Sequence, residues 1–254
     1  YHFDARGSRL RARLALQSSS ALGLHSGQAI RLAAVCETLH NASLIHDDLQ
    51  DQALERRGRG TVWHRYSPEL AICLGDLLIS AAYGALAEVD PDCDVSLLLR
   101  ETHRAVAKAV HGQATDLRLS RSLPQPDAIL AQYLATARAK SGAMLSLTLI
   151  LPLAASGYLG YLEQARKIGE DFAVGYQILD DLADVAEDLE GKSRPFRLNF
   201  RALFPEEMEP MAIEGRARTL ARQAFDSAAC SARLLPEGSG DALADLAHRL
   251  CGRD

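Results

Sequence analysis

The sequence has few of the residues that cross-link chains or interrupt helices. Of its 254 residues only five are cysteines, and these are scattered with no C-x-x-C pair. Neither a disulfide framework nor a cysteine zinc site is indicated, and a cytoplasmic location suits the chain best. Prolines number nine, tryptophan occurs once, and alternating runs rich in β-branched residues are nearly absent. This composition argues against a sheet protein.

Long apolar runs and basic runs are also missing. The longest apolar stretches, such as residues 144–157, are shorter than the roughly 20 residues of a membrane span, and no signal segment opens the chain. We therefore expect no membrane span. The net charge is −5 and no basic run is interleaved with aromatic residues, so nucleic acid is not an expected partner. The sequence begins at Tyr1 rather than methionine, which leaves room for native residues before it.

Alanine and leucine dominate, and apolar residues recur at helical spacing. The pattern predicts an all-α fold, with residues 1–254 forming a single domain, a helical bundle around a central cavity. Breaks are expected at 56–60, 90–92, 123–126 and 191–205. The expected helices cover residues 8–23, 27–53, 68–88, 94–118, 126–151, 158–188, 206–234 and 239–251.

Two aspartate clusters with the same spacing stand out from this apolar background. The first comprises Asp47, Asp48 and Asp51, and the second comprises Asp180, Asp181 and Asp184. Residues three and four apart share one side of a helix, so the carboxylates of each cluster project together and repel one another unless a cation neutralises them. Hard oxygen ligands suit Mg²⁺, which takes one or two carboxylates together with substrate phosphate oxygens. Two facing clusters therefore predict a magnesium-dependent diphosphate site.

The alternative interpretation is a solvated acidic helix face. For one cluster alone that interpretation is the better one, and neither cluster forms an EF-hand loop. Two matched clusters favour the magnesium site instead. Each cluster follows apolar residues, at 44–45 and 178–179, where a charge without a partner is unexpected.

A diphosphate also needs fixed cations. Arg56 and Arg57 follow the first cluster and precede a glycine, and guanidinium groups bind phosphate through paired hydrogen bonds. Only four of the 28 basic residues are lysines. Lys192 follows the second cluster, and Lys140 interrupts an otherwise apolar helix, where a cation is costly to bury without an anionic ligand.

Together these residues resemble the trans-isoprenyl diphosphate synthases, the family of farnesyl, geranylgeranyl and longer polyprenyl diphosphate synthases. The resemblance spans nearly the whole chain and implies the isoprenoid synthase fold. The matching segments, in the family's order, are residues 39–51 with the arginine pair 56–57, then 75–76, 112–113 with 116–117, 140–142, and 176–181 with Asp184.

The resemblance implies roles for individual residues. Asp47, Asp51 and Asp180 would be the leading Mg²⁺ ligands, supported by Asp48, Asp181 and Asp184, with three ions around the bound diphosphate. The allylic diphosphate would be held by Arg56, Lys140 and Lys192. A polar lip would stabilise the carbocation through oxygen dipoles, formed by Lys140, Ser141 and Gln177.

The second substrate of the family is isopentenyl diphosphate. Its site would comprise Arg11, His40 and Arg57, but the lysine of the family's Gly-Lys-x-x-Arg segment is replaced here by Ser8. The segment after Lys192, residues 193–204, also departs from the family's lysine-containing loop. The resemblance further implies a homodimer.

The expected activity is that of a trans-prenyltransferase. The allylic C–O bond ionises, the isopentenyl double bond attacks the cation, and proton loss completes one elongation, in an apolar tunnel that excludes water. The replacement at Ser8 leaves a class I terpene cyclase-like enzyme as an alternative, and a silent regulatory subunit of a synthase is another. Ala42 and Ser43 are small where bulky residues stop growth in the family, which favours products beyond farnesyl, unless Tyr83 or Leu86 closes the tunnel lower down.

Overall fold

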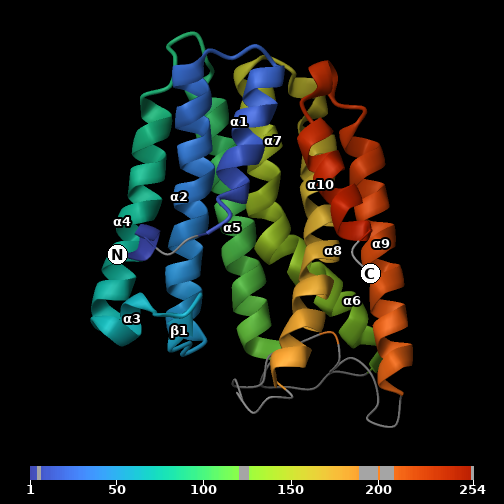
Figure 1. Ribbon diagram of the computed structural model, residues 1–254. Coiled ribbons are helices and arrows are strands. Elements are labelled where there is room, and N and C mark those ends of the chain that lie inside the picture. The colour runs from blue at the N-terminus through green and yellow to red at the C-terminus, as the bar shows by residue number, and fades with distance from the viewer. Residues whose placement is uncertain (5–6, 120–125, 189–199, 201–208, 253–254) are drawn as a thin grey trace.

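In the computed structural model the chain is a bundle of upright helices (Figure 1). The structure describes residues 1–4, 7–119, 126–188, 200 and 209–252. The first half contains η1 (His2–Asp4), α1 (Leu10–Ala21), α2 (Ser26–Gln50), α3 (Val62–Arg65), α4 (Pro68–Ala87) and α5 (Val95–Leu119). The second half contains α6 (Pro126–Ala137), η2 (Arg138–Gly142), α7 (Ala143–Ala155), η3 (Leu159–Tyr161), α8 (Leu162–Asp188), α9 (Pro210–Ala232), η5 (Pro236–Gly238) and α10 (Asp241–Cys251).

This architecture confirms the predicted all-α class. In the described part of the chain, the strands are confined to a two-residue pair, β1 (Glu55–Arg56) and β2 (Arg59–Gly60), which forms an antiparallel hairpin after α2. The turn of this hairpin uses positive φ angles at Arg57 and Gly58. The hairpin, η1 and α3 were not predicted from the sequence, because elements this short carry no hydrophobic period. The predicted break at 191–205 lies outside the described residues, apart from Phe200.

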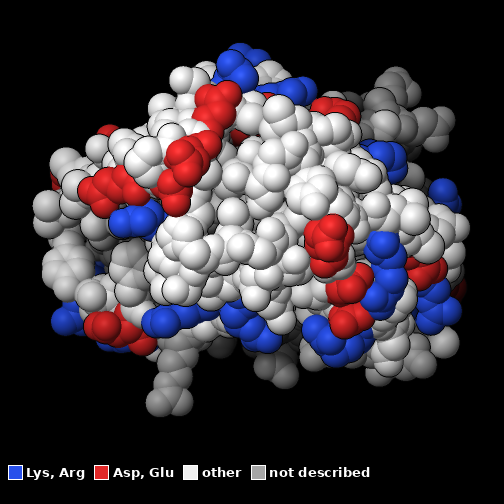
Figure 2. All heavy atoms as spheres, turned by 90° about the horizontal axis from the view of Figure 1, so that it is seen from above, with Lys and Arg blue, Asp and Glu red and all other residues white. Residues whose placement is uncertain are grey.

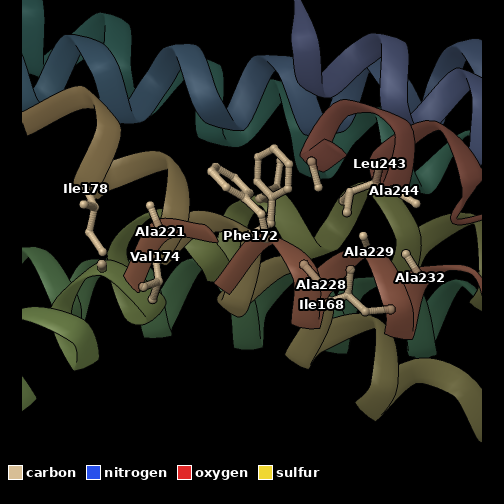
Figure 3. Packing of buried hydrophobic residues seen from close by; sticks show 14 of the residues in the cluster. Ile168, Phe172, Val174, Ile178, Ala221, Ala228, Ala229, Ala232, Leu243 and Ala244 are labelled. Carbon is tan, nitrogen blue, oxygen red and sulfur yellow. The ribbon is translucent and has the colours of Figure 1, made fainter. Parts of the chain in front are cut away.

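The core is organised around α7. All of its residues from Ala143 to Ala154 are buried, as expected for a helix that is apolar on every side. One side of α7 packs with α1, α2, α4 and α5. The other side joins the cluster that Figure 3 shows around Phe172, where alanines of α9 allow close packing against α8 and α10 packs against α9.

Two glycines let α7 and α8 approach closely. A Cβ at Gly169 would lie 2.6 Å from the backbone nitrogen of Ser146, and one at Gly142 would lie 2.7 Å from the Cα atom of Glu170. Substitution at either position would therefore push the helices apart.

The helix that contains Lys140 is not continuous. A π-helical turn, η2, spans Arg138–Gly142 between α6 and α7, whereas the sequence predicts one helix over 126–151. Single π-turns occur frequently at functional sites. Periodicity cannot reveal such a turn, because one wide turn shifts the register by only one residue.

The C-terminal ends of helices α2, α5 and α8 all lie at one end of the bundle, the lower end in Figure 1. The first aspartate cluster lies at the last turn of α2 and the second lies about one to two turns before the end of α8, so the fold brings them toward the same end. Figure 2 views the opposite end, where charged side chains lie mainly around an uncharged central area.

Candidate active site

Asp47 and Asp51 lie one turn apart at the end of α2, and both are partly buried. Asp180 is exposed at the corresponding end of α8. The structure thus places the three leading metal ligands of the sequence analysis at one end of the bundle. The side chain of Asp184 and the whole of Lys192 lie outside the described residues.

Asp48 has a different environment from its neighbours. Its side chain is 3% exposed, and its Oδ1 accepts a hydrogen bond from Nε of Arg56 at 2.8 Å and forms an ion pair with Nη2 at 2.7 Å. This charge-assisted contact attaches the β1–β2 hairpin to α2 and sets the position of Arg56. Asp48 is placed to orient a cation, and its predicted part in metal binding remains a prediction.

Asp181 is also held by internal contacts. Its carboxylate accepts hydrogen bonds from Tyr133 Oη at 2.7 Å, from Gln177 Nε2 at 2.8 Å and from the backbone nitrogen of Phe200 at 2.9 Å. Burial raises the pKa of Asp181 to about 6, against the effect of these hydrogen bonds. The carboxylate joins α6, α8 and Phe200. The NH₂ group of Gln177 is thus held by Asp181, and the predicted contact of its carbonyl oxygen with the carbocation remains a prediction.

Lys140 lies between two carboxylates from different helices. Its Nζ is 3.6 Å from Oδ2 of Asp47 and 3.6 Å from Oδ2 of Asp116. Burial raises the pKa of the Asp116 carboxyl, and Lys140 opposes that rise. The ammonium group therefore bridges α2 and α5 at Asp47, the first residue of the first aspartate cluster. The sequence analysis assigned no partner to Lys140, although Asp116 belongs to a quoted motif.

The predicted residues of the second substrate site also come together. The guanidinium of Arg57 lies over Gly7, where a Cβ would collide with Nη1. Nε of Arg11 is buried and makes no hydrogen bond within the described chain, and burial lowers the pKa of Arg11. His40 is close enough to Arg11, Arg56 and Arg57 to be affected by their charges. Ser8 is exposed at the edge of this group.

The sequence analysis did not include His2 in this group. Its Nε2 lies 3.0 Å from Oδ1 of Asn41, next to His40 on α2, and it is also affected by the charges of Arg56 and Arg57. No spacing rule connects a residue at the start of the chain to α2.

A cavity of about 280 Å³ opens beside Asp47 and Lys140. Its polar lining residues include Gln50, Gln113 and Ser141, and its apolar ones include Leu39, Ile79 and Met144. Ala42 and Ser43 both line it, as the predicted tunnel requires. The predicted barrier Leu86 is buried in the core instead, and Tyr83 does not line the cavity.

Oxygen donors of this kind suit Mg²⁺. In the described part of the chain, no three side chains gather as a ready-made metal cage. Mg²⁺ does not require one, since it retains waters and takes substrate phosphate oxygens alongside one or two carboxylates. Asp47, Asp51 and Asp180 therefore fit the ion as partial coordination sites that a diphosphate would complete.

His40 gives a stability prediction. Burial, reinforced by the charges of Arg11, Arg56 and Arg57, lowers the pKa of His40 from 6.5 to about 2. The unfolded chain therefore takes up this proton first as pH falls below about 6.5, and the folded state loses stability, by about 2 kcal/mol at pH 5. Chemical denaturation at pH 7 and pH 5 should show a smaller loss for His40→Gln than for wild type. Equal losses would show that His40 is protonated in the folded state.

Comparisons with known proteins identify the family of this chain. A sequence profile described as polyprenyl synthetase matches residues 1–197. An all-trans-nonaprenyl-diphosphate synthase (geranyl-diphosphate specific) from Rhodobacter capsulatus is 30% identical over 186 residues, 73% of this chain and 55% of the relative. The chain thus spans about half the length of the curated relatives it matches.

Solved structures share the fold. A geranylgeranyl pyrophosphate synthetase from Geoglobus acetivorans superimposes with a TM-score of 0.79 at 25% identity, covering 99% of this chain and 89% of that one. A geranyltransferase from Helicobacter pylori, complexed with magnesium and isoprenyl diphosphate, gives 0.81 at 23% identity, covering 98% and 85%. At that identity it supports the fold alone. With most of its length matched by the family profile, the chain belongs to the polyprenyl synthetase family.

Proposed function

We propose that this protein is a magnesium-dependent trans-prenyltransferase that joins an allylic diphosphate to isopentenyl diphosphate and releases diphosphate. The observation that carries the proposal is Lys140, placed between Asp47 and Asp116 in the lining of a largely apolar cavity. A cation held there by carboxylates is arranged for an anionic leaving group, and the cavity suits a hydrocarbon tail.

The allylic diphosphate would lie between the ends of α2 and α8. Asp47, Asp51 and Asp180 would hold Mg²⁺, which when bound draws negative charge onto the leaving diphosphate. Arg56, oriented by Asp48, would contact the phosphates, and Lys192 is proposed to do so from outside the described residues. Asp48, Asp181 and Asp184 are proposed to support the metal ions indirectly, and three ions are proposed as in the sequence analysis.

Isopentenyl diphosphate is proposed as the second substrate despite Ser8. Three guanidinium groups approach His40, and Nε of Arg11 is buried without a hydrogen bond among the described residues. A buried cation without a bonded anion is costly, so an anionic ligand at this position would be stabilising. This observation favours a two-substrate enzyme over the terpene cyclase-like alternative, which needs no second anion site.

The apolar cavity would protect the carbocation from water. Ser141 lines the cavity beside Lys140, consistent with the proposed polar lip. Gln177 is proposed to join this lip through its carbonyl oxygen while its NH₂ group donates to Asp181. Because Ala42 and Ser43 line the cavity without blocking it, we propose products longer than farnesyl diphosphate.

The activity test uses the whole chain with Mg²⁺ and dimethylallyl, geranyl or farnesyl diphosphate, each with and without isopentenyl diphosphate. Mass spectrometry should detect longer prenyl diphosphates only when both substrates are present. A cyclic hydrocarbon formed without isopentenyl diphosphate would identify a cyclase instead. The absence of turnover with every pair would favour a silent subunit.

A homodimer and a cytoplasmic location are proposed as well. By length and composition α4 could span a membrane, as some helices of soluble proteins could, but most of it is exposed here. Leu70 and Leu77 are 55% and 62% exposed on α4, and Val110 of α5 is 62% exposed beside the cavity. A second copy on this face would cover apolar surface and the side of the cavity.

Leu77→Glu tests this interface. A buried carboxylate on both copies would oppose association, so light scattering after gel filtration should show a dimer for wild type and a monomer for the variant. Met211→Glu is the control, because Met211 is 85% exposed on α9 at the opposite edge of the bundle (Figure 1). A wild-type monomer, or a dimer unaffected by Leu77→Glu, would contradict the proposed interface.

A further inference from the structure

Two glutamines meet in the lining of the cavity. Nε2 of Gln113, on α5, donates a hydrogen bond of 2.7 Å to Oε1 of Gln50, on α2. Both residues line the cavity, and Gln113 is only 9% exposed. With its NH₂ group used in this way, the Oε1 atom of Gln113 is buried and accepts no hydrogen bond from the described residues.

A buried carbonyl oxygen without a partner is costly, by about 1–3 kcal/mol. Such atoms are uncommon and often mark a functional constraint. Loose packing does not account for the missing partner of this oxygen, because the NH₂ group of the same amide is held at a short distance by Gln50. The bond to Gln50 therefore determines which end of the amide lacks a protein partner.

The backbone around Gln113 places it beside Lys140. Gly112 packs against the π-turn, where a Cβ would lie 2.7 Å from the backbone nitrogen of Lys140 and 2.8 Å from the Cβ of Ala139. One turn further along α5, Asp116 reaches Nζ of Lys140. The same segment of α5 thus supplies the counter-ion of Lys140 and the amide on the cavity wall.

We propose that Oε1 of Gln113 stabilises the allylic cation of the reaction, and that Gln50 is the positioning residue that orients this amide. The inference rests on the proposed prenyltransferase function. The C–O bond of the allylic diphosphate breaks heterolytically, and both electrons leave with the diphosphate. The π electrons of isopentenyl diphosphate then form the new C–C bond, and the resulting tertiary cation gives the alkene by losing a proton to the released diphosphate.

A neutral amide oxygen is suited to this role. It presents partial negative charge to the cation in a cavity that excludes water, where such dipoles act strongly. Unlike a carboxylate, it does not repel the departing diphosphate. Gln113 lines the cavity, whereas Gln177, the amide of the predicted polar lip, is not among the lining residues.

Gln113→Met removes the oxygen with little change in side-chain volume. We expect kcat to fall about 10²-fold, while both KM values stay within about twofold. The ionisation step can be measured alone, because ¹⁸O in the bridging position of the allylic diphosphate exchanges with the non-bridging positions when the C–O bond breaks and re-forms. This exchange should slow by the same factor. Gln113→Asn, which withdraws the oxygen by one carbon, is the second variant if methionine impairs folding.

The positioning role of Gln50 is tested by asking whether the effect of a Gln50 substitution on kcat requires Gln113. Gln50→Leu should lower kcat by a smaller factor, and Gln50→Glu, which keeps the acceptor oxygen, should restore most of the activity. In the double variant Gln50→Leu/Gln113→Met, kcat should equal that of Gln113→Met alone, because Gln50 acts through Gln113. Additive losses would overturn the positioning role.

Gln164→Met is the control, since the Gln164 amide is partly buried and donates to the Ser231 carbonyl away from the cavity. It should leave kcat unchanged. If the wild-type protein exchanges ¹⁸O but Gln113→Met exchanges it equally fast, the inference fails and the proposed function stands. If the wild-type protein neither exchanges nor elongates any allylic diphosphate, the proposed function fails, and this inference fails with it.

Discussion

Replacing Asp47 with asparagine is expected to lower kcat by about 10²–10³-fold, the range for loss of one group that stabilises transition-state charge. Asp47 is proposed as a Mg²⁺ ligand, and its Oδ2 atom also lies 3.6 Å from Nζ of Lys140. The substitution would remove an anionic oxygen from the metal and leave Lys140 with Asp116 as its only described carboxylate partner. Steady-state kinetics at saturating Mg²⁺ would measure the loss.

The fold should survive this change. Removing one charge from a cluster of carboxylates relieves repulsion with Asp51, which offsets the lost contact to Lys140. The melting temperature of the metal-free protein should stay within a few degrees of wild type. Asp92→Asn is the control, an exposed aspartate in the turn before α5. Near-normal turnover of Asp47→Asn would show that the metal assignment is wrong.

The arrangement of the aspartate clusters was largely predictable from the sequence. Helical spacing indicates that the carboxylates of each cluster project together, and two apolar helices in a bundle can bring such ends together. The spacing could not show how the surroundings of the individual carboxylates differ. Asp48 and Asp181 are each turned inward by partners from distant segments, Arg56 of the hairpin and Tyr133 of α6.

Sequence spacing likewise predicts the hydrogen bond of one glutamine pair of partners but not of the other. Gln177 lies four residues before Asp181, so an intrahelical bond between them was available from spacing alone. In contrast, the bond between Gln50 and Gln113 joins two helices and depends on how closely α5 approaches the π-turn at Lys140. Contacts across helices depend on packing depth, and the sequence pattern determines only which side of a helix is apolar.

Replacing Glu101 with alanine is expected to destabilise the protein by about 3–5 kcal/mol, the usual cost of removing one member of a buried ion pair. Oε2 of Glu101, on α5, lies 2.8 Å from Nη2 of Arg166, on α8, and the two side chains are only 11% and 8% exposed. The variant would leave Arg166 buried with Glu163, whose side chain is 78% exposed. Thermal denaturation should show a fall in Tm of about 10 °C.

The double variant Glu101→Leu/Arg166→Met separates the cost of an orphaned charge from the value of the pair. Because burying two charges is itself costly, replacing both with apolar side chains should recover most of the lost stability. Arg218→Ala is the control, since Arg218 and Glu214 form an exposed pair on α9 whose loss should cost less than about 1 kcal/mol. Glu101 lies roughly 18 Å from Gln113 along α5, at 1.5 Å per residue. Each variant should therefore have the wild-type kcat per folded molecule. A lower kcat in the stable double variant would show that this ion pair also supports the active site.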